Sequence, residues 1–142
     1  MRDENNIPKL LNALRELEET RLEIGIFGEE DTELLMIASV HEFGSVKINV
    51  PSRSFIRAGF DENINKIQRQ AENLLDGVLA FRIDVKAFYE ALGGVCVTLF
   101  QQFLTELQQP ALKEETVIRK GSSNPLIDTG RLRSSITWRV VR

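Results

Sequence analysis

Residues 124–140 read NPLIDTGRLRSSITWRV and decide how the end of the chain folds. Pro125 fixes its own φ and disfavours helix at the residue before it. Asp128 or Thr129 can cap a short helical turn, because each side chain offers an oxygen to backbone N–H groups two or three residues further on. Apolar residues then alternate over 136–141, the period-2 pattern of a strand with one buried face. We therefore expect a turn, a helix of one turn and a closing strand that returns to a sheet formed earlier in the chain.

The length and composition are those of one globular domain spanning residues 1–142. The chain has 142 residues, of which 42% are hydrophobic and 27% are charged. This length is sufficient to bury a core, and the composition disfavours disorder of the whole chain. Small and turn-forming residues at about 119–125 predict a flexible loop before the closing segment.

Charge is unevenly distributed along the chain. Residues 117–142 carry six basic and one acidic side chain, a net charge of +5, whereas residues 1–116 carry 12 basic and 20 acidic side chains, a net charge of −8. An acidic body with a basic end favours head-to-tail self-association. The alternative is a solvated surface whose imbalance has no function, and the sequence leaves both readings open.

Cys96 is the only cysteine, so one chain can form neither an intrachain disulfide nor a thiolate metal cluster. Its apolar neighbours predict a buried structural thiol. The polar N-terminus has no apolar signal-peptide core, and the longest apolar region, around 88–104, is interrupted by Gln101 and Gln102. An intracellular protein, at least during synthesis, is the simplest interpretation.

Hydrophobic periodicity predicts an α+β domain. We expect a small, mainly antiparallel sheet of about three strands, with two long antiparallel helices packed on one face and short helices besides. The strands are expected at 22–27, 46–50 and 136–140. The short helices are expected at 7–19 and from Asp31 or Thr32 to a left-handed cap at Gly44.

The two long helices are expected from about residue 56 and from an Asp84 cap. The apolar stripe expected on the first consists of Ile56, Phe60, Ile64, Ile67, Ala71, Leu74 and Val78. The stripe on the second is wider, which predicts deeper burial.

Candidate chemistry is sparse. His41-Glu42 would need a second histidine four residues after the first to form a zinc site, and His41 is the only histidine in the chain. We therefore expect no enzyme, no metal and no cofactor. The basic end could contact nucleic acid phosphates, so a small regulatory or DNA-binding module is the second hypothesis.

Four short motifs occur in order along the chain. They are IGIF at 24–27, HEFG at 41–44, PSRSFI at 51–56, and PAL at 110–112 leading to PLIDTGRL at 125–132. Together they resemble the virion morphogenesis or neck proteins of tailed bacteriophages, also called head–tail joining or tail-completion proteins. The resemblance covers roughly residues 22–140.

The resemblance implies a structural protein of a phage or prophage-derived neck, located in the virion and, during assembly, in the host cytoplasm. Such proteins form rings, commonly of six copies, between the portal side of the capsid and the tail. Their partners are further copies of themselves, portal-side head-closure proteins and the tail terminator or tail-tube protein. Genomic DNA passes through the lumen without being read. Tail terminators are similar in size and fold, so the station along the neck stays open.

A ring needs heterologous subunit contacts that close on themselves. The candidates for such contacts are Arg53, Phe55, Asp128, Thr129, Arg131 and Arg133. For the first four residues the alternative is intramolecular, as a loop anchor and a helix cap. Ser52 and Ser54 replace an alanine and a proline of the family motif, which predicts a less rigid entry to the first long helix.

Overall fold

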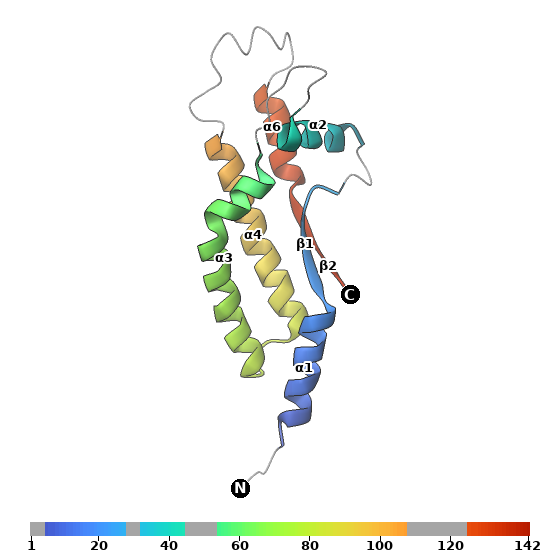
Figure 1. Ribbon diagram of the computed structural model, residues 1–142, viewed down its shortest axis with the longest axis vertical. Helices are drawn as coiled ribbons and strands as arrows, with labels where there is room; N and C mark the ends of the chain where they lie inside the picture. The colour runs from blue at the N-terminus through green and yellow to red at the C-terminus, as the bar shows by residue number, and fades with distance from the viewer. Residues whose placement is uncertain (1–4, 28–31, 45–53, 108–124) are drawn as a thin grey trace.

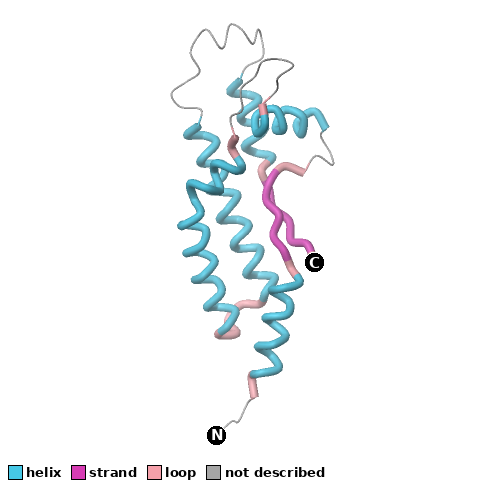
Figure 2. Tube along the Cα trace, in the orientation of Figure 1, coloured by secondary structure: helices cyan, strands magenta, loops and turns pink. Residues whose placement is uncertain are grey.

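The computed structural model describes residues 5–27, 32–44, 54–107 and 125–142, the side chains of Leu107 and of residues 125–129 excepted. In this part of the chain, five helices accompany one two-stranded antiparallel sheet (Figures 1 and 2). The elements, in order, are α1 (Ile7–Glu19), β1 (Arg21–Gly25), α2 (Thr32–Phe43), α3 (Ile56–Leu79), α4 (Val85–Leu107), α6 (Pro125–Ser135) and β2 (Thr137–Val141). The mixed α and β class is confirmed.

The two strands pair across the whole chain, since β1 lies near the N-terminus and β2 ends at residue 141. Their register places Ile24 opposite Trp138 and Glu23 opposite Arg139. The closing segment therefore does return to an earlier strand, as its alternation predicts. The third strand, expected at 46–50, lies outside the described residues.

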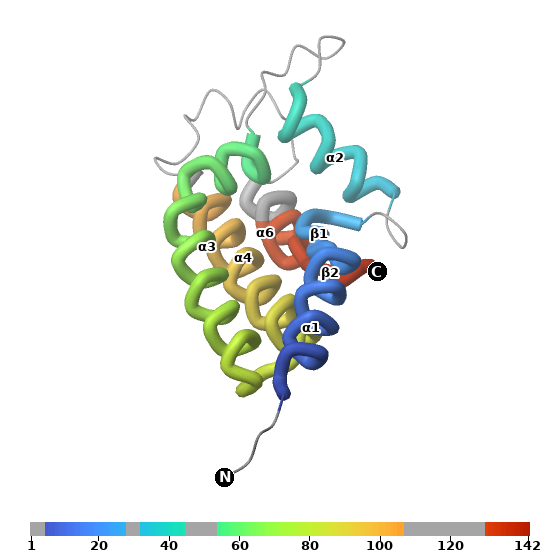
Figure 3. Tube along the Cα trace, turned by 60° about the horizontal axis from the view of Figure 1, so that its bottom comes forward, coloured from blue at the N-terminus to red at the C-terminus, as the bar shows by residue number. Residues whose placement is uncertain are grey.

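Helix α4 is the centre of the domain. It contacts both strands and α6 on one side and α3 on the other, and Figures 1 and 3 show α3 separated from the strands by α4. The expectation that both long helices pack on one face of the sheet is not confirmed. A ribbon of two strands is only wide enough for one helix, so α3 packs on α4 instead.

Several helix ends follow the sequence signals. Asp84 caps α4, because its Oδ1 accepts a hydrogen bond of 2.7 Å from the backbone N–H of Ala87. Gly44 ends α2 with a φ of 74°, and its N–H donates to the carbonyl of Val40 at 2.7 Å. Helix α1 has the bounds expected, 7–19.

Helix α6 differs from expectation. It has 11 residues rather than one turn, and it begins at Pro125, a residue favoured at the first helical position. Asp128 and Thr129 therefore lie inside the helix and not at its N-cap.

The buried face of α3 matches the predicted stripe at Ile67 and Val78 but departs from it in the first half of the helix. Gly59 and Asn63 are buried, whereas Phe60 and Ile64 are 44% and 38% exposed. Gly59 allows the ring of Phe103 to come close, since a Cβ there would lie 3.2 Å from that ring. Asn63 is buried at low cost because its amide donates to the carbonyl of Gly59 at 2.8 Å. Small and satisfied polar residues thus replace part of the apolar stripe at the contact with α4.

Two adjacent glycines in α4 predict opposite effects of the same substitution. A Cβ at Gly93 would lie 2.6 Å from the Trp138 ring, whereas one at Gly94 meets nothing within 4 Å. Gly93→Ala should lower the free energy of unfolding by about 1–3 kcal/mol, because β2 must move away from α4. Gly94→Ala should raise it by about 0.5–1 kcal/mol through helix propensity. Urea denaturation measures both, and equal effects of the two variants would contradict the close approach of Trp138 to α4.

Candidate functional site

A single carboxylate joins two of the sequence motifs. Glu42, near the end of α2, accepts hydrogen bonds from the hydroxyl of Ser54 at 2.8 Å and from the backbone N–H groups of Phe55, Ile56 and Arg57 at 3.0, 3.0 and 3.1 Å. These N–H groups belong to the start of α3 and have no partner within the helix. We call this arrangement the Glu42 cap. It connects HEFG at 41–44 with the SFI of PSRSFI at 54–56.

Ser54 completes the Glu42 cap. Its hydroxyl donates to Glu42 and also accepts from the N–H of Ala58 at 3.3 Å. The sequence predicted a less rigid entry to α3 because serine stands at position 54. Ser52 lies outside the described residues, and the Ser54 hydroxyl supplies hydrogen bonds at the helix start that a proline could not make.

The Glu42 cap also sets the protonation of its carboxylate. Burial of the group opposes ionisation, but the hydrogen bonds from Ile56, Ser54, Arg57 and Phe55 together outweigh burial and lower the pKa of Glu42 below its usual 4.5. The positive end of the α3 dipole favours the charge in the same direction. Glu42 is therefore ionised under neutral conditions and acts as a charge-assisted cap.

Phe55, next to the cap, belongs to a buried cluster that contains residues of three of the four sequence motifs, and the Glu42 cap links the fourth, HEFG, to it. Its side chain is fully buried. The cluster contains Leu34 and Ala38 of α2, Leu132 and Ile136 of the closing segment, and Phe100 and Leu104 of α4, with Ile24 and Ile26 packed against it. Segments that are far apart in sequence thus share one core at the end of the domain where α2 and α6 lie (Figure 1).

The residues predicted to form subunit contacts are in different environments. Arg53 lies outside the described residues, and Phe55 belongs to the core just described. Asp128 and Thr129 lie on α6, and their side chains are not described. Arg133 is exposed and donates to Thr105 Oγ1 at 3.2 Å. Arg131, also on α6, is half-buried.

Part of the basic end of the chain is used within the chain. Arg139 forms an ion pair with Glu23 at 2.8 Å, across the β1–β2 register, and lies over the ring of Phe27 at 4.1 Å. Arg142 pairs with Glu19 at 3.4 Å. The charge segregation seen along the sequence is thus partly neutralised when the two ends of the chain come together.

Exposed apolar residues on α1 and α2 were not identified from the sequence. On α2, Met36 and Phe43 are 64% and 73% exposed. On α1, Ile7, Leu11 and Leu14 are 62%, 54% and 44% exposed and follow one another at helical spacing. We call these three residues the α1 stripe. The periodicity of the sequence predicted the bounds of α1 but not which of its apolar side chains are exposed.

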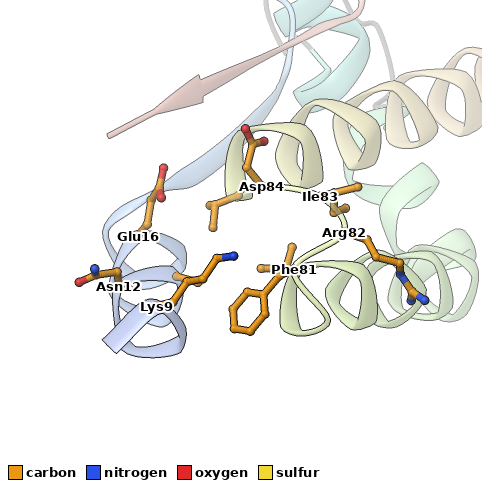
Figure 4. A pocket seen from close by; sticks show the side chains of 10 residues that line it. Lys9, Asn12, Glu16, Phe81, Arg82, Ile83 and Asp84 are labelled. Carbon is orange, nitrogen blue, oxygen red and sulfur yellow. The ribbon is translucent and has the colours of Figure 1, made fainter. Parts of the chain in front are cut away.

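The side of α1 opposite the α1 stripe contacts the rest of the domain. The Tyr89 hydroxyl donates to the carbonyl of Leu17 at 2.8 Å and lies 3.0 Å from that of Thr20. Lys9 lies over the ring of Phe81, with 4.4 Å from its Nζ to the ring centroid. Phe81 belongs to the α3–α4 turn and has a φ of 59°, which is unusual for an aromatic residue. The two side chains line an open cleft of about 310 Å³ between α1 and this turn (Figure 4).

The described residues bear on two kinds of site, a metal site and a reactive thiol. No group of three or more His, Cys, Asp or Glu is placed to hold a metal ion among them. Cys96 is a buried free thiol, as expected, and burial raises its pKa to about 11. None of the helices described here is long and apolar enough to cross a membrane.

Comparison with known proteins gave no match, whether with protein-family models, with characterised sequences or with solved structures. The residues and geometry of the chain itself therefore carry the functional argument.

The Glu42 cap predicts a pH-dependent loss of stability. Glu42→Gln should lower the free energy of unfolding at pH 7 by about 1–3 kcal/mol, because charge-assisted hydrogen bonds become neutral ones or are lost. A lowered folded-state pKa adds stability above pH 4.5 that is lost as the pH falls through the folded-state pKa. The difference between wild type and variant should therefore shrink in acid. Urea titrations from pH 7 to pH 3 measure it, with exposed Glu62→Gln as control, and a difference that persists unchanged in acid would contradict the cap.

The burial of Cys96 predicts an inert thiol. A thiol-specific reagent at pH 8 should label the folded protein at least a hundredfold more slowly than the urea-unfolded chain, because the buried thiol is both protonated and inaccessible. Mass spectrometry over time measures the labelling, and comparable rates in the two states would show that α4 is open at this position.

Proposed function

We propose that this chain is a structural component of the head–tail connector of a tailed bacteriophage or prophage, a neck or tail-completion protein. It forms a ring between the portal side of the capsid and the tail, is needed for virion assembly, and lets genomic DNA pass through its lumen without reading the sequence. It carries out no catalysis and uses no cofactor. The motifs that resemble this family are the starting point of the proposal.

The single observation that carries the proposal is the convergence of these motifs. The described parts of the motifs contribute to one unit: IGIF at 24–27 and the end of PLIDTGRL at 125–132 supply apolar side chains to the Phe55 cluster. HEFG at 41–44 supplies the carboxylate that caps the helix entered by PSRSFI at 51–56. A set of short motifs that is structurally interdependent is stronger support for a shared fold than the same motifs scattered over the surface.

The exposed apolar faces support an assembly protein. The α1 stripe and the α2 pair Met36 and Phe43 lie towards opposite ends of the domain (Figure 1). Exposed apolar surfaces of this kind mark protein–protein contacts. Two different surfaces on one subunit are what a heterologous contact requires, and heterologous contacts generate rings.

A tail terminator ring capping the tail tube is the nearest alternative, and it shares these features. A DNA-binding regulatory module has less support. Two arginines of the basic end, Arg139 and Arg142, are already paired with carboxylates of the same chain. The aromatic Trp138 is packed against Gly93 rather than available for base stacking.

The proposal predicts association with neighbouring virion proteins. Light scattering should give the mass of a closed ring for the purified protein alone, or only after mixing with the portal-side or tail-tube protein encoded beside it. The matched variant is Phe43→Glu, which should prevent or weaken one of these associations without loss of folding. A monomer that ignores these partners and shifts labelled DNA at low salt, in a manner lost in Arg131→Gln/Arg133→Gln, would contradict the proposal.

A further inference from the structure

The α1 stripe has a candidate partner on another helix of the same chain. Phe60 and Ile64 of α3, 44% and 38% exposed, form another exposed apolar surface, which we call the α3 stripe. The α1 helix of the same chain cannot cover it. The buried core around α1 contains Val78 near the C-terminal end of α3, and Ile64 lies 14 residues before Val78, about 21 Å along the helix.

The charges beside the α1 stripe have a defined order. Arg15 and Glu18 follow Leu11 by four and seven residues and lie next to the stripe on the helix surface. Both side chains are exposed, and the ion pairs between described residues include neither of them. The sequence from Leu11 towards the C-terminus is thus apolar, positive and then negative.

The charges beside the α3 stripe have the opposite order. Asp61 and Arg57 precede Ile64 by three and seven residues. Both side chains are exposed and likewise lack an ion-pair partner among the described residues. The sequence from Ile64 towards the N-terminus is apolar, negative and then positive.

We infer that α1 of one copy packs antiparallel on α3 of a second copy, with the α1 stripe on the α3 stripe. With Leu11 opposite Ile64, Arg15 lies beside Asp61 and Glu18 beside Arg57, about one helical turn apart in both helices. The occupant is a second copy, because in this orientation the two charges beside Leu11 meet charges of opposite sign beside Ile64, and Leu14 lies near Phe60. Symmetric pairing of two α1 helices about Leu11 would instead set Arg15 opposite the apolar Ile7.

This contact rests on the proposed function, which places it in a ring. It adds to that function the two surfaces through which neighbouring copies meet. Because the stripes are different surfaces of one subunit, each copy can donate its α1 helix and receive that of a neighbour. Repetition of the contact either closes a ring or extends a filament.

Cysteine cross-linking tests the contact directly. Leu11→Cys and Ile64→Cys chains, mixed under mild oxidation, should form a disulfide-linked dimer, since disulfides require Cα atoms within about 7 Å. Each variant alone should remain uncross-linked. Glu62→Cys is the matched control for Ile64→Cys, because Glu62 is exposed on the opposite side of α3 and should cross-link at least tenfold less. Circular dichroism establishes that each variant is folded.

The charge order gives a second readout. Arg15→Glu in the Leu11→Cys chain should reduce the yield of the mixed disulfide several-fold, and Asp61→Arg in the Ile64→Cys chain should restore it. Equal cross-linking by Glu62→Cys, dimers of Leu11→Cys alone, or a protein that stays monomeric at millimolar concentration would each overturn the inference.

The outcomes separate this contact from the connector role. A ring that forms on a portal-side protein without the Leu11–Ile64 cross-link overturns the contact and supports the role. A cross-linked oligomer that binds no virion protein supports the contact and contradicts the role.

Discussion

The end of the domain that contains α2, α6 and the start of α3 depends on the hydrogen bonds accepted by the carboxylate of Glu42. Helix α3 begins with N–H groups that have no partner of their own, and these groups stand beside the buried Phe55. An aromatic side chain can be buried at a helix start only if the neighbouring backbone N–H groups have hydrogen-bond acceptors. Glu42, which belongs to α2, accepts hydrogen bonds from these N–H groups. One ionised side chain therefore joins α2 to the start of α3 and allows the Phe55 cluster to form there. The closing segment then packs on that cluster and returns to β1.

The other end of the domain is organised differently. Helix α1 is attached by the Tyr89 hydroxyl, by the contact of Lys9 with Phe81 and by a small apolar cluster around Val78. Three of its apolar side chains, the α1 stripe, face outward. A helix with such limited attachment and an exposed stripe is expected to gain further stabilisation from another protein surface. The domain thus combines a firmly joined core, where the sequence motifs meet, with an exposed helix suited to assembly. This combination is the physical basis for proposing a ring-forming connector protein.

Much of the secondary structure could be predicted from the sequence, because its signals are local. Periodicity and caps gave α1, the Asp84 start of α4 and the Gly44 end of α2. The features that failed depend on tertiary packing. The buried side of α3 follows Gly59 and Asn63, which no hydrophobic pattern marks. The Glu42 cap joins residues that are 12 to 15 positions apart, and no local sequence pattern pairs a carboxylate with a helix start at that separation. Which apolar residues remain exposed likewise depends on how far each helix is covered, and this cannot be read from amphipathicity alone.

Hydrogen exchange at the start of α3 tests the central claim most directly. In the wild-type protein, the amides of Phe55, Ile56 and Arg57 should be protected as strongly as the core of α3, because the carboxylate of Glu42 accepts all three. In Glu42→Ala these amides should exchange at least a hundredfold faster, together with the amides of α2, while the middle of α3 changes little. Protection of residues 55–57 that survives this substitution, or loss of it with α2 unaffected, would contradict the account.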